Sequence, residues 1–200
     1  MLAHPCAKPY FLNSKEMPGR WRLFLIRTFE GITPQLGAGV FIDETALVLG
    51  DVVLGDEVSI WPMTVLRGDV NSIRIGARTN IQDNSVLHVT HDGPYTPGGV
   101  GLTVGEDVTI GHRVILHACE IGDRCLIGMG AIVMDEAVLD DDVFLAAGTL
   151  VPPGKHLEGG YLYRGRAEQV RPLSDKERAN LKYSAEHYVR VKNRHMAVNP

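Results

Sequence analysis

The sequence predicts an all-β fold, a parallel solenoid of short strands that is followed by one α-helix at the C-terminus. Aliphatic residues recur at every sixth position through most of the 200-residue chain, and a glycine often follows directly. The end of the chain instead carries apolar residues at helical spacing. A short repeat of fixed length is typical of a solenoid, in which each unit stacks on the next and buries a continuous core.

The period of six fits neither an amphipathic helix, which needs about 3.6, nor a lone strand, which needs two. It fits one short strand and one turn that repeat together, and we expect glycine where the backbone bends tightly. These glycines are Gly55, Gly76, Gly105, Gly111, Gly122 and Gly128. The aliphatic runs are Val48, Leu54, Ile60, Leu66; Ile75, Ile81, Leu87; Val104, Ile110, Leu116; and Ile121, Ile127, Val133, Leu139, Leu145, Val151.

This pattern resembles the hexapeptide-repeat family over roughly residues 37–155. The resemblance implies a left-handed parallel β-helix in which three hexads form one triangular coil. The Gly- and Pro-rich insertion between Leu87 and Val104 predicts an external loop. The sequence Pro-Pro-Gly-Lys after Val151 predicts the end of the repeat.

The C-terminal region has the signals of a helix. Ser174 and Glu177 predict a capping box, and Leu181, Ala185 and Tyr188 form an apolar stripe behind it. We therefore expect an N-terminal extension, partly flexible, at residues 1–30, a β-helix domain at 31–170, and a C-terminal helix with a tail at 171–200.

Composition excludes several classes of protein. A formal net charge of −4 argues against a general nucleic-acid binder. The sequence contains no apolar run near the ~20 residues that a membrane-spanning helix needs. Three cysteines without a C-x-x-C pair argue against a disulfide framework and a cysteine zinc site. A reducing, cytoplasmic location is the simplest expectation.

The repeat also places histidines. If three hexads form one coil, equivalent residues lie above one another at ~4.8 Å, and Arg67, His88 and His117 form one column. His112 belongs to another face, beside Gln82, and could reach the pair only from a neighbouring subunit. Three histidines with an open fourth position describe a catalytic zinc site. The sequence thus predicts a metal on His88, His112 and His117, between the subunits of a homotrimer.

Six stretches resemble the γ-class carbonic anhydrases, and above all their small bacterial branch. They are R-G-D at Arg67 to Asp69, N-I-Q-D-N at Asn80 to Asn84, His88, I-G-H-R-V-I-L-H at Ile110 to His117, G-Y-L-Y-R-G at Gly160 to Gly165, and P-L-S-D-x-E at Pro172 to Glu177.

The resemblance implies His88 and His117 from one subunit and His112 from the next as metal ligands. It further implies that Gln82 hydrogen-bonds water on the metal, that Asn80 lies nearby, and that Tyr188 reaches the pocket. The remaining charged residues that it places near the site, as ties between subunits or in a direct role, are Arg67, Asp69 and Asp83.

The implied activity is reversible hydration of CO₂ to bicarbonate by a metal-bound hydroxide, with Zn²⁺ as the default metal and Fe²⁺ or Co²⁺ as alternatives. Val70 and a loop with Asp92 as its one acidic residue depart from the acidic pattern of the family, which predicts slow proton export. His91 is a solvent-facing residue or a proton carrier. Two alternatives stay open: an acyltransferase or thioesterase of the hexapeptide type, and a non-catalytic metal-binding assembly subunit.

Overall fold

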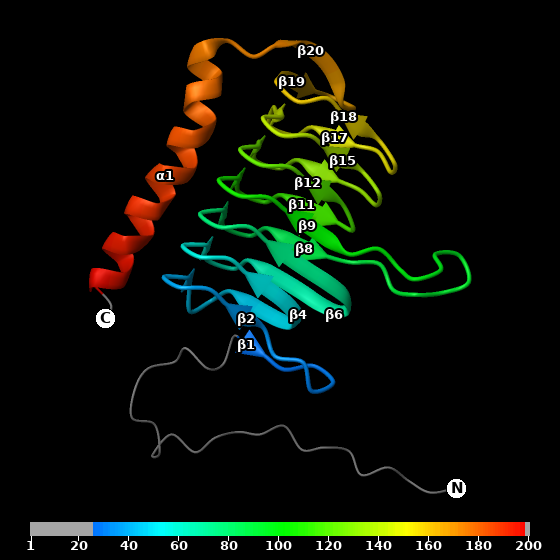
Figure 1. Cartoon of the computed structure of the whole chain (residues 1–200), viewed down its shortest axis with the longest axis vertical. Helices are drawn as coiled ribbons and strands as arrows, with labels where there is room; N and C mark the ends of the chain where they lie inside the picture. The colour runs from blue at the N-terminus through cyan, green and yellow to red at the C-terminus, as the bar shows by residue number, and fades with distance from the viewer. Residues whose placement is uncertain (1–25, 199–200) are drawn as a thin grey trace, which may run out of the picture.

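The computed structural model describes residues 26–198, so Cys6 and most of the predicted extension at residues 1–30 lie outside the described residues. The chain winds as a left-handed parallel β-helix, and helix α1, Asp175–Val198, runs along one side (Figure 1). Residues 26 and 27 are already part of the solenoid, because they pair with Val48 and Leu49 of strand β4, Leu47–Leu54. The strands are β1 Ile26–Arg27, β2 Gln35–Leu36, β3 Phe41–Ile42, β4 Leu47–Leu54, β5 Ser59–Ile60, β6 Val65–Ile75, β7 Asn80–Ile81, β8 Val86–His88, β9 Leu102–Val104, β10 Thr109–Ile110, β11 Ile115–His117, β12 Glu120–Ile121, β13 Leu126–Ile127, β14 Ile132–Val133, β15 Val138–Leu139, β16 Phe144–Leu145, β17 Leu150–Val151, β18 His156–Leu157, β19 Tyr161–Arg164 and β20 Glu168–Pro172.

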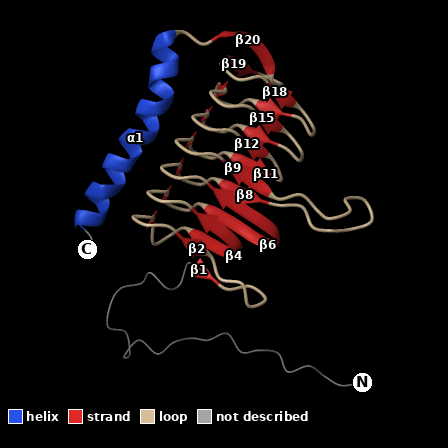
Figure 2. Cartoon of the chain, in the orientation of Figure 1, coloured by secondary structure: helices blue, strands red, loops and turns tan. Residues whose placement is uncertain are grey.

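The strands form a prism with three faces (Figure 2). Strand β6 is long enough to serve two of them, because its start pairs with β8 and its end pairs with β9. The face that contains the start of β6 and strands β8, β11, β14 and β17 carries His88 and His117, and we call it the histidine face. The eight-stranded sheet forms the third face. The strands pair in parallel, except for β19 with β20.

The stacking predicted by the period of six is confirmed. Ile121 pairs with Leu139, Ile127 with Leu145, and Val133 with Val151, each pair one coil of three hexads apart. The inward aliphatic side chains are almost completely buried. Such a core favours folding by roughly 25 cal/mol for each Å² of apolar surface removed from water. The loop between β8 and β9 leaves the prism as the insertion predicts (Figure 1).

The predicted end of the repeat after Val151 is wrong. Strand β18 pairs with β15, and β19 pairs with β16, so the solenoid continues for two more strands. Pro152 and Pro153 lie in the turn between β17 and β18, where proline is tolerated because the ladder needs no N–H group there.

The expected role of the repeat glycines is also wrong in part. The glycines that follow the aliphatic residues do not have a positive φ. They are needed because adjacent coils approach closely: a Cβ on Gly76 would lie 2.5 Å from the carbonyl carbon of Gly105. The left-handed turn positions are instead taken by larger residues, among them Glu57, Arg78 and Asp107.

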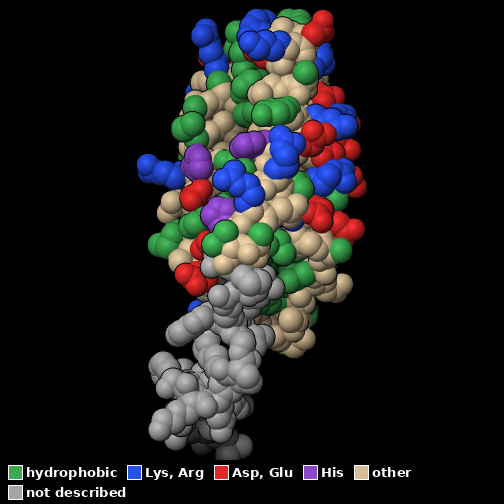
Figure 3. Space-filling model, turned by 90° about the vertical axis from the view of Figure 1, so that its left-hand side faces the viewer, with side chains coloured by type: hydrophobic (Ala, Val, Ile, Leu, Met, Phe, Trp, Pro, Cys, Tyr) green, Lys and Arg blue, Asp and Glu red, His purple; other side chains and the backbone are tan. Residues whose placement is uncertain are grey.

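These turn residues form a charge ladder along one edge of the prism. Glu57, Arg78, Asp107, Arg124 and Asp142 stand at equivalent positions of successive coils and alternate in sign. Arg78 Nε donates to Asp107 at 2.7 Å, and Arg124 Nε donates to Asp142 at 2.9 Å. Acidic and basic side chains accordingly gather along one edge of the face shown in Figure 3.

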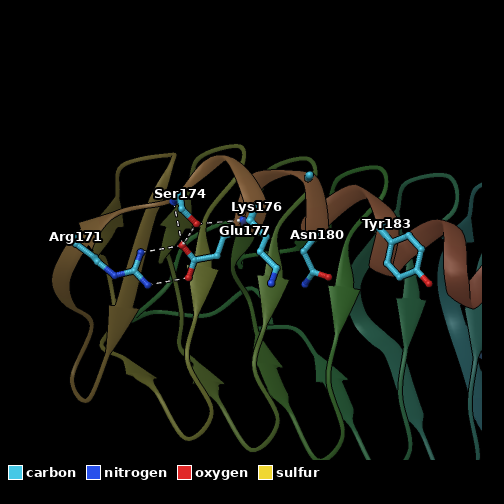
Figure 4. A pocket seen from close by; sticks show the side chains of 7 residues that line it. Arg171, Ser174, Lys176, Glu177, Asn180 and Tyr183 are labelled. Atoms are coloured by element: carbon cyan, nitrogen blue, oxygen red, sulfur yellow. Dashed lines mark hydrogen bonds and ion pairs between the residues drawn. The ribbon is translucent and has the colours of Figure 1, made fainter.

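Helix α1 begins at the predicted capping box, which is confirmed. Ser174 Oγ donates to Glu177 at 2.8 Å, and the Glu177 N–H points back to Ser174 Oγ at 3.3 Å (Figure 4). Leu181 and Ala185 are buried against the solenoid, as the apolar stripe predicts. Near the other end of α1, Lys192 is fully buried. Its ammonium lies 2.6 Å from Glu57, the first acidic residue of the charge ladder. No helix of the described residues is long and apolar enough to cross a membrane.

We expect Glu57→Gln to lower the free energy of unfolding by about 3 kcal/mol, because it leaves the buried Lys192 ammonium without a counter-charge. Adding Lys192→Met should recover most of this loss. Denaturant titration at one protein concentration measures both. The control is Glu106→Gln, which removes a solvent-exposed partner of Arg78 and should cost less than about 1 kcal/mol. A Glu57→Gln variant as stable as the control would contradict the prediction.

Candidate metal centre

Two imidazoles face each other on the histidine face. His88 ends β8 and His117 ends β11, and the two residues pair directly in the parallel ladder. Nδ1 of His88 lies 3.2 Å from Nε2 of His117. Arg67 lies one coil further along the same column, as predicted. The parallel strand pairing therefore brings Arg67, His88 and His117, the three members of the predicted column, together.

A carboxylate holds the far nitrogen of each ring. Nε2 of His88 lies 3.0 Å from Asp69, and Nδ1 of His117 lies 2.8 Å from Asp135. Burial works to raise the pKa of Asp69, but its hydrogen bonds to Arg67 and His88 outweigh this and lower the pKa. For Asp135, hydrogen bonds from Thr90 and His117 likewise outweigh burial and lower the pKa. Both acids are thus ionised at neutral pH and can only accept hydrogen bonds.

When both rings are neutral, these two hydrogen bonds leave lone pairs on the facing nitrogens. With protons on Nε2 of His88 and Nδ1 of His117, the two opposed nitrogens repel each other unless a cation lies between them. Two nitrogen ligands of a tetrahedral zinc ion, with bonds of about 2.0–2.1 Å, are separated by about 3.3 Å. The observed 3.2 Å matches this separation. Burial lowers the pKa of His88 despite the Asp69 hydrogen bond, so this ring is neutral, as a metal ligand must be.

The third predicted ligand, His112, lies at the edge between β10 and β11. Its Nδ1 is 2.9 Å from Asp83, and its side chain is 48% exposed. In the neutral ring, a hydrogen bond from Nδ1 to this carboxylate leaves Nε2 as the nitrogen available to a metal. Each predicted ligand therefore has a carboxylate partner of the kind that orients metal-binding histidines. Such a pair is not sufficient by itself, because the exposed His156 also pairs with Asp140.

Three further predicted site residues lie around His112. Gln82 is one coil below Gly111, and its amide donates to Asn80 at 3.0 Å. Asn80 is fully buried and donates to Thr109, which links it to helix α1 through Ser184. Burial, and then the charge of Asp83, raise the pKa of Tyr188, so this tyrosine lies within electrostatic reach of Asp83.

One protomer therefore presents two separate half-sites. Within residues 26–198, no group of three or more His, Cys, Asp or Glu side chains could hold a metal ion. The histidine half-site contains His88 and His117, with Arg67, Asp69 and Asp135. The amide half-site contains His112, with Asn80, Gln82, Asp83 and Tyr188. The two half-sites lie near opposite ends of one short stretch of chain, because His112 precedes β11 and His117 ends it.

An aliphatic stripe runs between the half-sites. Val86, Ile115 and Ile132 point outward from adjacent strands at the same register position and are 40%, 41% and 36% exposed. Contiguous exposed apolar patches are typical of interaction surfaces. The stripe is where a second subunit would have to pack to bring its own half-site near.

The sequence did not reveal Asp135 and Thr90. The Thr90 hydroxyl donates to Asp135, which in turn fixes His117. Asp135 lies in the turn after β14, one coil beyond His117, so the period could have suggested it; Thr90 lies in the insertion, where the period gives no register. A surface hollow of about 740 Å³ lies elsewhere, at the start of α1, where Arg171 pairs with Glu177. We assign it to the helix cap rather than to a metal site.

We expect Asp135→Asn to weaken divalent-metal binding by about 10- to 100-fold, because an uncharged amide can accept or donate and no longer fixes the tautomer of His117. Competition with a chromogenic chelator measures the affinity. The matched control is Asp140→Asn, which removes the same kind of pair from His156. Equal affinities for the two variants would show that Asp135 does not support a metal ligand.

The chain is similar in sequence to two named proteins. The chain is 54% identical over 173 residues to Protein YrdA of Escherichia coli, covering 86% of this chain and 94% of that protein. It is 40% identical over 168 residues to Gamma carbonic anhydrase 1, mitochondrial, of Arabidopsis thaliana, covering 83% of this chain and 60% of the plant protein.

Among solved structures, a hexapeptide transferase family protein from Anaplasma phagocytophilum superposes with a TM-score of 0.78 at 41% identity, covering 84% of this chain and 96% of that one. No family model matches the chain. Taken with the coil register and the three histidine positions, these similarities show that the chain belongs to the γ-class carbonic anhydrase family of hexapeptide-repeat proteins.

Proposed function

We propose that this protein is a metal-dependent carbonic anhydrase that interconverts CO₂ and bicarbonate at sites shared between the subunits of a homotrimer. The observation that carries the proposal is the pair of facing ring nitrogens of His88 and His117, 3.2 Å apart, with a carboxylate at the other nitrogen of each ring. The carbonic anhydrase name of the plant relative supports the choice of reaction.

The metal would be held by His88 and His117 of one subunit and His112 of the next. Three neutral nitrogen donors suit Zn²⁺, and imidazole also accepts Fe²⁺ and Co²⁺. When bound by three histidines, such a metal supplies hydroxide at neutral pH as the nucleophile for CO₂.

The trimer follows from the two half-sites. They lie on the two sides of the aliphatic stripe, so an arrangement with threefold symmetry can join unlike half-sites at three equivalent interfaces. Packing along the stripe would remove Val86, Ile115 and Ile132 from water. Arg67, Asp69 and Asp83 would then lie near the contact, where the first two are already paired with each other at 2.6 Å.

The other residues of the site would bind and orient the reactants and the metal ligands. The Gln82 amide, held by Asn80, would direct its remaining hydrogen-bonding capacity toward a water at the site. Arg67, whose side chain is 45% exposed, would attract the bicarbonate anion. Tyr188 would act on His112 through Asp83, as a positioning residue.

Acyl transfer is the second candidate, because the solved relative from Anaplasma phagocytophilum is called a hexapeptide transferase family protein. Neither cysteine of the described residues is suited to act as the nucleophile for acyl transfer. Burial raises the pKa of the Cys119 thiol, and it raises the pKa of the Cys125 thiol to about 12. We infer a reducing, cytoplasmic location from these two free, buried thiols. A non-catalytic metal-binding subunit is the third candidate.

We expect wild-type protein loaded with zinc to hold one metal per chain and to hydrate CO₂, and His112→Ala to lose most of both. Metal analysis and stopped-flow hydration measure the two quantities on the same samples. His156→Ala is the control, since it removes a histidine that also pairs with a carboxylate. Full metal content in His112→Ala would contradict the proposed ligand set. Turnover of acetyl-CoA without CO₂ hydration would favour acyl transfer, and metal binding with neither activity would favour the assembly subunit.

A further inference from the structure

A cavity of about 530 Å³ adjoins the histidine half-site. One wall is formed by Asp69, the carboxylate that binds Nε2 of His88. Other lining residues come from the base of the loop between β8 and β9, at His91 and Asp92, and from Phe29 and Ile32 near the start of the described chain. Asp69 thus separates the cavity from a predicted metal ligand.

His91 is held at this cavity by the residue before it. The Thr90 hydroxyl donates to Asp135, which fixes His117, and the Thr90 carbonyl accepts hydrogen bonds from Val100 N and from the Asn71 side chain. Residue 93 is a glycine, and a Cβ there would lie 3.2 Å from Nε2 of His91. The loop base is therefore tied to the half-site, and glycine leaves room for the His91 ring.

The His91 imidazole is also free to exchange protons. Among the described residues, no hydrogen bond or ion pair to another side chain engages it, whereas His88, His112, His117 and His156 each pair with a carboxylate. It is exposed to solvent. Imidazole is the side chain whose ordinary pKa is nearest to neutrality, so it can both accept and release a proton at working pH.

We propose that His91 carries the proton released by CO₂ hydration from the histidine half-site to solvent. The inference rests on the proposed function. Hydration converts CO₂ and H₂O into HCO₃⁻ and one proton. That proton passes through water to a free nitrogen of His91, giving imidazolium. A buffer base then removes the proton, and neutral His91 is restored with no net change in the protein.

Acidic residues predominate among the charged groups that line the cavity. They are Glu30, Asp51, Asp69 and Asp92. Arg74 pairs with Asp51 at 2.8 Å, and Arg67 pairs with Asp69 at 2.6 Å, while the Asp92 carboxylate accepts from Gly98 N in the loop. The polar lining suits water, which the proton transfer needs.

The test compares His91→Ala with wild type at low and high buffer concentration, with His156→Ala as control. We expect kcat of His91→Ala in dilute buffer to fall at least about tenfold, because an intramolecular acid–base group is lost. The value of kcat/KM, which reports the conversion of CO₂ itself, should stay within about twofold. Added imidazole should restore kcat to the variant and leave wild type nearly unchanged.

The possible failures are distinguishable. A wild-type protein that hydrates CO₂, with a His91→Ala variant of unchanged kcat in dilute buffer, would overturn the role of His91 and leave the proposed function intact. An equal loss of kcat and kcat/KM without rescue by imidazole would also overturn it, because that pattern indicates a damaged site. A zinc-loaded wild type without hydration activity would overturn both proposals.

Discussion

The in-register stacking of parallel coils is the constraint on which the other features of this protein depend. Each residue of a coil lies about 4.8 Å from its equivalent in the next coil, so a choice made at one position of the repeat is carried along a whole edge or face. Inward positions become an aliphatic core. One edge becomes the charge ladder from Glu57 to Asp142. Its charges alternate in sign, so side chains of neighbouring coils can form ion pairs such as Arg78 with Asp107 and Arg124 with Asp142. Like charges at that spacing would repel each other and destabilise the fold.

The histidine half-site applies the same constraint to metal binding. The parallel β pairing sets His88 above His117. Two carboxylates, Asp69 in β6 and Asp135 in the turn after β14, then decide which nitrogen of each neutral ring is free. Without Asp69 and Asp135, either ring could present the wrong tautomer to the metal. Stacking cannot add the third histidine, because His112 precedes β11 and His117 ends it. A site that needs all three must therefore draw on two chains, and the exposed aliphatic stripe lies where those chains would meet.

Much of the fold could be predicted from the sequence because the period is a direct consequence of stacking. The pairing of Ile121 with Leu139 and the column of Arg67, His88 and His117 follow from counting residues, and both are confirmed. Counting fails at turns and insertions. Asp83 and Asp135, which pair with His112 and His117, lie in turns, and the contact of Lys192 with Glu57 joins a helix to a coil far away in sequence. The role of the repeat glycines was misjudged for a related reason: the spacing locates them, but the close approach of coils that requires them appears only in three dimensions.

The central claim is that each metal site joins the histidine half-site of one subunit to His112 of another. Complementation tests it most directly. Chains carrying His112→Ala and chains carrying His117→Ala are co-expressed with different affinity tags, and mixed trimers are isolated by selecting both tags. Neither variant alone should bind zinc with the wild-type affinity. A mixed trimer contains one interface with all three ligands intact, so it should recover about a third of the wild-type zinc content. Mixed trimers that bind no more zinc than either variant alone would contradict the shared site.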